Sequence, residues 1–182
     1  MSPSPEKIHI LPIGPVGRRV LEAIAKEVEA RFLCPVAVAQ ALPCPGYAYD
    51  KARRQYLADA ILSHLRTLEL LAAHKVLGVV DLDLYAPGLN FVFGQASLRG
   101  REAIIALPRL REEFYGLAKD EPLFQERVLK EAIHELGHTY GLSHCPHPRC
   151  VMHFSNSLVD TDLKGKTFCS RCQRTLGKSG QG

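Results

Sequence analysis

The sequence predicts one domain of the α/β (α+β) class, with a mixed β-sheet, a helix that carries the functional residues and a small metal-held C-terminal part. Three observations predict this fold. Strand-like and helix-like segments alternate through the first half, which favours parallel strands with helices on the sheet faces. A pair of strand-like runs around a turn follows, typical of an antiparallel element. Residues 145–182 then hold few large apolar side chains but four of the six cysteines, so this end needs an external staple.

The first half of the chain alternates between apolar runs typical of strands and apolar residues at helical spacing. Residues 7–13 (KIHILPI) are mostly apolar and are followed by Gly14-Pro15, as expected for a buried strand. Leu21, Ile24 and Val28 then recur at helical spacing. In chain order we expect a strand over 7–13, a helix over 16–32, a strand over 34–42, a helix over 51–72 and a strand over 75–85.

A hairpin and a long helix are expected in the second half. The hairpin strands should cover 90–96 and 102–107, because turn-forming residues separate these two apolar runs. The helix should begin after Asp120, a suitable N-cap residue, and run to about Tyr140. Gly141 is well placed to end it in the left-handed conformation.

The composition excludes several classes of protein. Hydrophobic residues make up 46% and charged residues 23% of the chain, which is ordinary globular usage and excludes wholesale disorder. The net charge is +4 and no segment collects the excess, so no nucleic-acid partner is expected. No apolar run is long enough to span a membrane, and the first residues lack a secretory pattern, so we expect a cytoplasmic protein. In that compartment cysteines favour metal binding or free thiols over disulfides.

The strongest functional signal is the pattern H-E-x-x-H-x-x-G-x-x-H over residues 134–144. His134 and His138 are four residues apart, so they share one helix face and direct their imidazoles at one point. A third ligand does not fit on the same straight helix, but Gly141 allows the chain to turn back and return His144 to the metal. Three protein ligands leave the fourth tetrahedral position of a zinc ion for water, as a catalytic site requires.

Glu135 is the expected general base. It adjoins the first ligand but lies off the ligand face, toward the zinc-bound water. Zinc lowers the pKa of that water toward about 7 and polarises the scissile carbonyl group. Glu135 would take a proton from the water and pass it to the leaving amine. The predicted reaction class is therefore hydrolysis of an amide bond.

A second, structural zinc site is predicted directly after the first. Two pairs of closely spaced cysteines are typical of a closed tetrahedral site with four thiolates. These pairs are Cys145-x4-Cys150 and Cys169-x2-Cys172. We therefore expect two zinc ions, one catalytic and one structural.

The thiolate zinc would also stabilise the small C-terminal segment 145–182, which cannot form a core of its own. Cys34 and Cys44 fit neither pattern, and we interpret them as ordinary buried or surface thiols.

These motifs resemble the archaemetzincins, a branch of the metzincin metallopeptidases. The similarity rests on the zinc motif followed by Cys145, on Cys150-Val151-Met152-His153-Phe154-Ser155-Asn156, on Cys169-Ser170-Arg171-Cys172, and less distinctively on 81–85 and 89–91. The resemblance implies a metzincin-like twisted mixed sheet with an antiparallel edge strand above a horizontal cleft. It also implies two subdomains: an upper catalytic one over residues 1–144, with the sheet and the active-site helix beneath it, and a small lower one over residues 145–182, tied by the second zinc.

The resemblance also implies a Met-turn at Met152, in which the methionine forms an apolar floor under the histidines without binding the metal. An ordinary core methionine is the alternative. Some metzincins place a tyrosine two residues later as a zinc ligand or oxyanion donor, but here that residue is Phe154. Any electrophilic help beyond zinc must come from elsewhere. His153 is a candidate, although a solvent-facing histidine is the favoured interpretation.

The expected substrate is a peptide or protein. Metzincins bind substrate by strand addition, and the hairpin 89–107 is the candidate for this, with an ordinary structural hairpin as the alternative. Some family members are regarded as aminopeptidases, so short peptides fit. The sequence reveals no carboxylate to hold an α-amine, and endopeptidase action stays open. No membrane partner is expected, and the oligomeric state is left open, with a monomer compatible.

A binding module is the competing interpretation. In that case the zinc at the histidines would be catalytically weak or inactive, and the cysteine site would recognise a peptide or a nucleic acid. The mild positive charge permits this reading. Glu135 counts against it, because metal binding alone does not need a carboxylate at that position.

Overall fold

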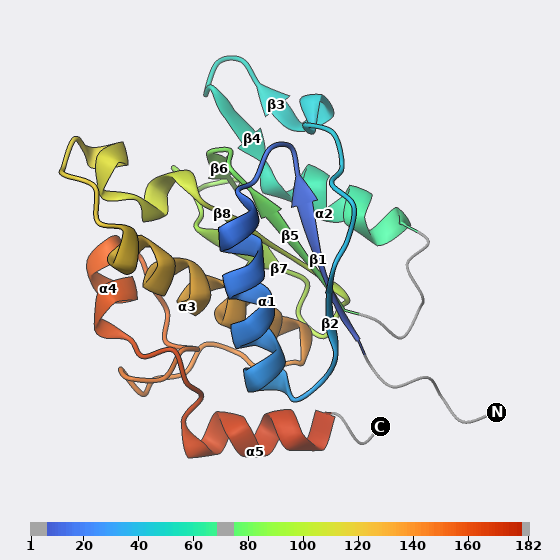
Figure 1. Cartoon of the computed structure of the whole chain (residues 1–182), viewed down its shortest axis with the longest axis vertical. Helices are drawn as coiled ribbons and strands as arrows, with labels where there is room; N and C mark the ends of the chain where they lie inside the picture. Colours follow the sequence, from blue (N-terminus) through green and yellow to red (C-terminus); the bar gives the residue numbers. More distant parts are fainter. Residues whose placement is uncertain (1–6, 69–74, 180–182) are drawn as a thin grey trace.

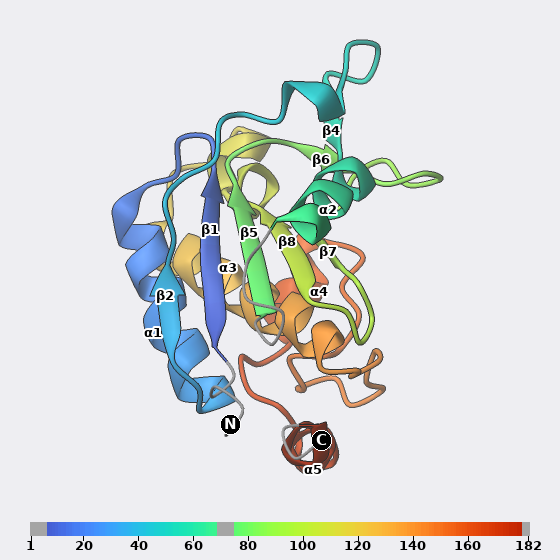
Figure 2. The ribbon, with the colours of Figure 1, turned by 90° about the vertical axis from the view of Figure 1, so that its right-hand side faces the viewer.

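The computed structural model describes residues 7–68 and 75–179, and it confirms the predicted class. In this part of the chain, a twisted five-stranded sheet lies between helices on its two faces. Helices α1 (Arg18–Phe32) and α3 (Glu121–Thr139) cover one face, and α2 (Ala58–Thr67) covers the other, as Figure 2 shows. The C-terminal segment with α5 lies below the end of the sheet (Figure 1).

The main sheet is mixed, as the sequence predicts. Its order is β2-β1-β5-β8-β7 over the described residues. The first four of these strands run parallel to one another, and the edge strand β7 is antiparallel to β8, with Gly94 opposite Ile105. The strand bounds are β1 Ile8–Ile13, β2 Val36–Val38, β5 Lys75–Val80, β7 Gly94–Ala96 and β8 Glu102–Ala106.

The predicted helix over 51–72 begins too early. Residues 51–54 form a turn, because the Asp50 carboxylate accepts hydrogen bonds from the backbone N–H groups of Ala52 and Arg53. A short strand, β4 (Gln55–Leu57), comes before α2, and residues 69–72 lie outside the described residues. With β3 (Tyr49–Asp50) and β6 (Leu84–Tyr85), β4 forms a small second sheet that the sequence did not reveal.

The side chains of the central strands alternate between two cores, as the period of a strand requires. Ile8 and Ile10 of β1 face α1 and α3, whereas Leu11 and Ile13 pack toward α2. On the neighbouring β8, Ile105 belongs to the first core and Ile104 to the second. Because both faces of the central parallel strands are buried, their sequences are continuous apolar runs.

A third apolar cluster lies beneath the C-terminal half of α3. It joins Ile133 of that helix to Leu142, Val151, Met152 and three of the cysteines. The short helices α4 (Leu158–Leu163) and α5 (Ser170–Ser179) follow, together with the 3-10 turns Gly46–Ala48, Pro108–Leu110 and Glu112–Tyr115 elsewhere in the chain. The proposed division into subdomains at 144/145 stays a prediction. Among the described residues, none of the helices combines the length and apolar character needed to cross a bilayer.

Candidate active site

Helix α3 presents the zinc motif, and local interactions fix both of its ends. The Asp120 carboxylate accepts a hydrogen bond from the N–H of Leu123 at 2.9 Å, so it is the N-cap that the sequence predicts. At the other end Gly141 adopts φ +84°, in the left-handed region. Its N–H donates to the carbonyl of His138, and the N–H of Leu142 donates to the carbonyl of Gly137. The chain therefore reverses where His144 must return toward the helix.

The reversal brings the three histidines of the motif together. The Nε2 atoms of His134 and His138 are 3.1 Å apart, and one ring nitrogen from each of the three histidines lies within 4.8 Å of the others. Tetrahedral zinc with bonds of about 2.0–2.1 Å places its nitrogen ligands about 3.3 Å apart. The donor set therefore fits one zinc ion.

Hydrogen bonds to the backbone fix which nitrogen faces the metal site. His134 Nδ1 lies 2.8 Å from the carbonyl oxygen of Val151, and His138 Nδ1 lies 2.6 Å from that of Leu142. A carbonyl only accepts, so each Nδ1 carries the proton and each Nε2 keeps its lone pair. Both rings are thus oriented as metal ligands by the backbone that follows the helix.

Burial keeps these imidazoles in the neutral form that binds metal. It lowers the pKa of His134 well below its ordinary value, and the nearby Lys164 ammonium lowers it further. Burial also lowers the pKa values of His138 and His144. Protons therefore compete weakly for these three ligands near neutral pH.

Met152 lies under the helix, where the resemblance places a Met-turn residue. Its side chain is fully buried, and its carbonyl accepts a hydrogen bond from the N–H of Cys145. A Cβ atom at Gly137 would lie only 2.5 Å from Met152 Sδ. Glycine at this position therefore lets the thioether pack directly against the helix backbone between the two histidines.

Glu135 sits on the opposite side of the helix, against the edge strand. A Cβ at Gly94 would lie 2.6 Å from Glu135 Cγ and 2.7 Å from the carbonyl oxygen of Ile104. Burial raises the pKa of the Glu135 carboxyl well above its ordinary value, and the charge of Glu131 raises it further. A dication at the three histidines would act in the opposite direction, since it favours the carboxylate.

The three histidines and Glu135 line one cleft of about 820 Å³. The segment 91–96, which ends in the edge strand, and residues 154–156 also line this cleft. The Phe154 ring packs 4.8 Å from the His144 ring between centroids, at the place where some metzincins have tyrosine. The position therefore supplies an apolar surface to the cleft and no hydroxyl group.

The structure adds two charged residues that the sequence reasoning missed. Glu131 and Lys164 also line the cleft, and Lys164 Nζ lies 2.9 Å from a Glu131 carboxylate oxygen. Glu131 is three residues before His134, so helical spacing could have placed it beside that ligand. Lys164 is thirty residues further along the chain, and no sequence pattern links it to the site.

The four cysteines predicted as a second site also come together. Their sulfur atoms lie within 4.8 Å of one another, and Cys145 Sγ is 3.7 Å from Cys169 Sγ. Tetrahedral zinc–thiolate bonds of about 2.3 Å give S–S separations of about 3.8 Å. The backbone N–H of Cys172 at the start of α5 lowers the pKa of the Cys169 thiol to about 6, which favours the thiolate form. This donor set fits a closed zinc site.

The remaining candidates lie outside these groups. His153 Nδ1 lies 2.9 Å from the carbonyl oxygen of Cys145, so the ring turns toward the backbone of the cysteine segment. Cys34 is half-buried and Cys44 is exposed, and neither forms a disulfide. The edge hairpin is present, although its first strand covers Gly94–Ala96 and is shorter than predicted.

Comparison with known proteins identifies the family of the chain. The model of peptidase family M54 matches residues 18–178. Archaemetzincins of Pyrococcus furiosus and Methanocaldococcus jannaschii are 45% and 44% identical over 177 and 175 residues, covering 94% and 96% of this chain and 92% and 94% of theirs.

Solved structures show the same similarity. The crystal structure of archaemetzincin from Methanopyrus kandleri gives a TM-score of 0.85 at 40% identity and covers 98% of both chains. The Archaeoglobus fulgidus archaemetzincin, solved in complex with malonate, gives a TM-score of 0.81 at 39% identity, covering 93% of this chain and 99% of that one. The chain therefore belongs to peptidase family M54, the archaemetzincins, and is a zinc metallopeptidase.

Proposed function

We propose that the chain hydrolyses peptide bonds with a catalytic zinc held by His134, His138 and His144 and with Glu135 as the general base. The observation that carries this proposal is the shared cleft, which is lined by three metal-competent imidazoles and one buried carboxylate. Metal storage alone would need the imidazoles only. A carboxylate aimed into the same space is what proton transfer requires.

When bound, zinc supplies Lewis acidity that makes water a better nucleophile and polarises the scissile carbonyl. The residues of the chain do the rest. The Glu135 carboxylate takes a proton from the attacking water and delivers it to the leaving nitrogen. Gly94 leaves the space that this carboxylate occupies against β7. Because His134 and Glu135 are buried, electrostatic interactions at these two groups are stronger than they would be in water.

We propose that substrate binds as an added strand along β7. This strand is the last in the order of the main sheet among the described residues, so its outer edge is not paired within that sheet. The adjoining residues 91–96 line the cleft beside the histidines. An extended peptide paired there would gain backbone hydrogen bonds and pass close to the proposed metal site.

Within the described lining of the cleft, the carboxylates are Glu131 and Glu135. Glu131 is ion-paired with Lys164, and Glu135 is the proposed base, so neither is available to fix a substrate α-amine. We therefore favour cleavage within an extended segment, and aminopeptidase action on short peptides is the alternative. Cleavage assays on peptides with free and with acetylated N-termini distinguish these two activities, because only an aminopeptidase should fail to cleave the acetylated form.

We propose that a second zinc, held by Cys145, Cys150, Cys169 and Cys172, staples the C-terminal segment. All six cysteines are free of disulfides. Thiolate ligands need reducing conditions, so we propose that the protein works in the cytoplasm.

The Glu135→Ala variant tests the proposed chemistry. We expect it to keep the parental zinc content and fold but to lose peptide cleavage by at least about 100-fold, the lower end of the usual contribution of a general base. Purified, zinc-loaded parent and variant should be compared on a broad peptide library. If the two behave alike, the protein acts as a zinc-containing binding module and the proposal is wrong.

A further inference from the structure

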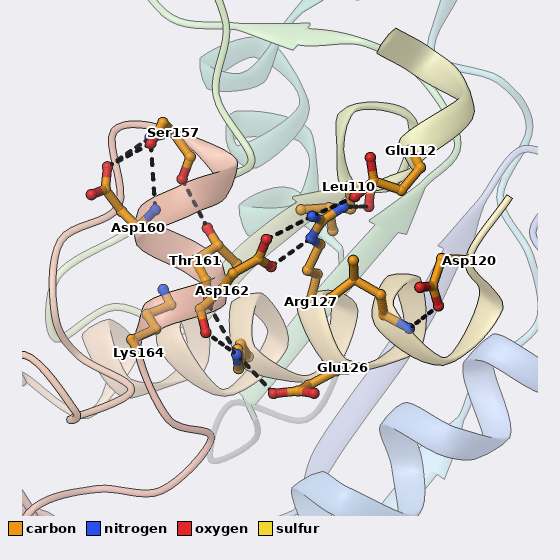
Figure 3. Close-up of polar contacts among 12 residues, drawn as sticks. Leu110, Glu112, Asp120, Glu126, Arg127, Ser157, Asp160, Thr161, Asp162 and Lys164 are labelled. Carbon is orange, nitrogen blue, oxygen red and sulfur yellow. Dashed lines mark hydrogen bonds and ion pairs between the residues drawn. The ribbon is translucent and has the colours of Figure 1, made fainter. Parts of the chain in front are cut away.

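A buried lysine touches one of the proposed zinc ligands. The Lys164 side chain is fully buried, and its Nζ lies 3.4 Å from His134 Nδ1. Figure 3 shows Lys164 directly after α4, in the segment that packs against the active-site helix. A cation at this place is unfavourable for binding a dication, so its presence needs a reason.

The contact with His134 is electrostatic and does not serve as a hydrogen bond. His134 Nδ1 already donates its proton to the carbonyl of Val151 at 2.8 Å. That nitrogen therefore has no lone pair to offer the ammonium group. Lys164 faces the edge of a ligand ring, and Glu131 supplies the balancing negative charge at 2.9 Å.

Lys130 is a useful comparison on the same helix. Its Nζ donates to the carbonyls of Thr161 and Asp162 and pairs with the Glu126 carboxylate, so its role in holding α4 is fully accounted for. The neighbouring Arg127 holds Asp162 in the same way (Figure 3). Two buried cations thus already attach α4 to α3, and Lys164 is not needed for that purpose alone.

We propose that the Lys164–Glu131 pair is a positioning and charge-tuning element that sets how tightly the histidines hold zinc and how strongly the bound ion acts as a Lewis acid. This rests on the proposed function of the three histidines. The Lys164 charge opposes electron donation by His134 and repels the dication, while the Glu131 charge attracts it. Because the pair is buried, these opposing effects are weakly screened by water.

The proposal predicts effects of opposite sign for the two partners. Lys164→Met should tighten zinc binding at the histidine site by about 10–100-fold, the size usual for groups around metal ligands, and Glu131→Gln should weaken it by a similar factor. The double variant should return to within about threefold of the parent. Lys164→Arg, which keeps the charge, should stay near the parent. Lys164→Met should also lower the cleavage rate per loaded site while binding zinc more tightly.

Chelator competition on the full-length protein measures these affinities. A His138→Ala variant identifies the zinc that remains at the cysteines, so the histidine site is obtained by difference. Lys130→Met serves as the matched control. We expect it to lower the thermal stability but to keep the zinc affinity within about threefold of that of the parent. Unfolding transitions of every variant show whether it is folded.

The direction of the change in zinc affinity in each variant decides between the two explanations. A merely structural role predicts that Lys164→Met and Glu131→Gln both weaken zinc binding and that neither restores the other, and that result would overturn the inference. If Lys164→Met does not fold, the double variant Lys164→Met/Glu131→Gln takes its place. Zinc affinity restored above that of Glu131→Gln supports the inference, and no restoration overturns it. Failure of the proposed function has a different signature, namely a parent protein without zinc at the histidines or without cleavage.

Discussion

Gly94→Ala should disable the site without removing its metal. The new Cβ would lie 2.6 Å from Glu135 Cγ and 2.7 Å from the Ile104 carbonyl oxygen, whereas ordinary contacts begin near 3.4 Å. The difference, 3.4 − 2.6, is about 0.8 Å. The Ile104 backbone belongs to β8 inside the sheet, so it yields less readily than the Glu135 side chain. Displacement of a catalytic group by about 1 Å costs roughly 100-fold in rate, so we expect a fall in kcat/KM of about 50–100-fold.

The assay is hydrolysis of a fluorogenic peptide that the parent cleaves, with zinc content measured on the same samples. We expect two zinc ions per chain in the variant and a loss of about 1–3 kcal/mol in unfolding free energy from overpacking. Gly46→Ala is the matched control, because a Cβ there meets no atom within 4 Å and should leave activity near that of the parent. A folded, zinc-loaded Gly94→Ala variant with more than half of the parental kcat/KM would refute the placement of Glu135 as the base.

Three further predictions concern stability. Cys169→Ser should release one zinc per chain and lower the melting temperature. An unchanged zinc content and melting temperature would contradict the proposed structural zinc site. Although burial acts to raise the pKa of Glu102, hydrogen bonds from Ser97 and Arg66 hold it below its ordinary value. The Glu102 carboxylate therefore stabilises the fold at pH values above the pKa that it has in the unfolded chain. This stabilisation is lost as the pH falls through the lower pKa that Glu102 has in the folded chain. Glu102→Gln should melt lower than the parent at pH 7 and lose less stability on acidification; parallel pH profiles would contradict this. Ser157→Ala removes one half of the capping box of α4 and should lower the unfolding free energy, measured with urea, by about 1 kcal/mol. An unchanged unfolding free energy would show that this cap does not stabilise the fold.

The sequence was most informative where function depends on short-range spacing. The i, i+4 histidines and the left-handed glycine after them constrain each other locally, so α3 and its reversal follow from the residues alone. Alternation of strand and helix patterns likewise predicted the mixed sheet, because each pattern reflects burial of one face or stripe. The clustered cysteines could be grouped because the spacing within each pair is typical of zinc sites.

Features that depend on tertiary contacts were missed. The start of α2 was placed too early, because periodicity continues through 51–54 while the Asp50 side chain holds these residues in a turn. Gly94 gave no signal, since its importance arises only when Glu135 packs against β7. Lys164 and Glu131 meet because α4 folds back onto α3, and no local pattern records such a meeting. The short helices α4 and α5 were also not predicted, as they hold too few apolar positions for a clear helical period.

X-ray diffraction from crystals of the zinc-loaded protein, recorded on both sides of the zinc absorption edge, tests the central claim most directly. The account predicts two anomalous peaks, one within about 2.0–2.1 Å of a nitrogen of His134, His138 and His144 and one among the four cysteine sulfurs. The first ion should keep a coordination position for water or substrate. A peak at the cysteines alone, or a histidine-bound ion whose fourth position is filled by a side chain of the protein, would contradict the account.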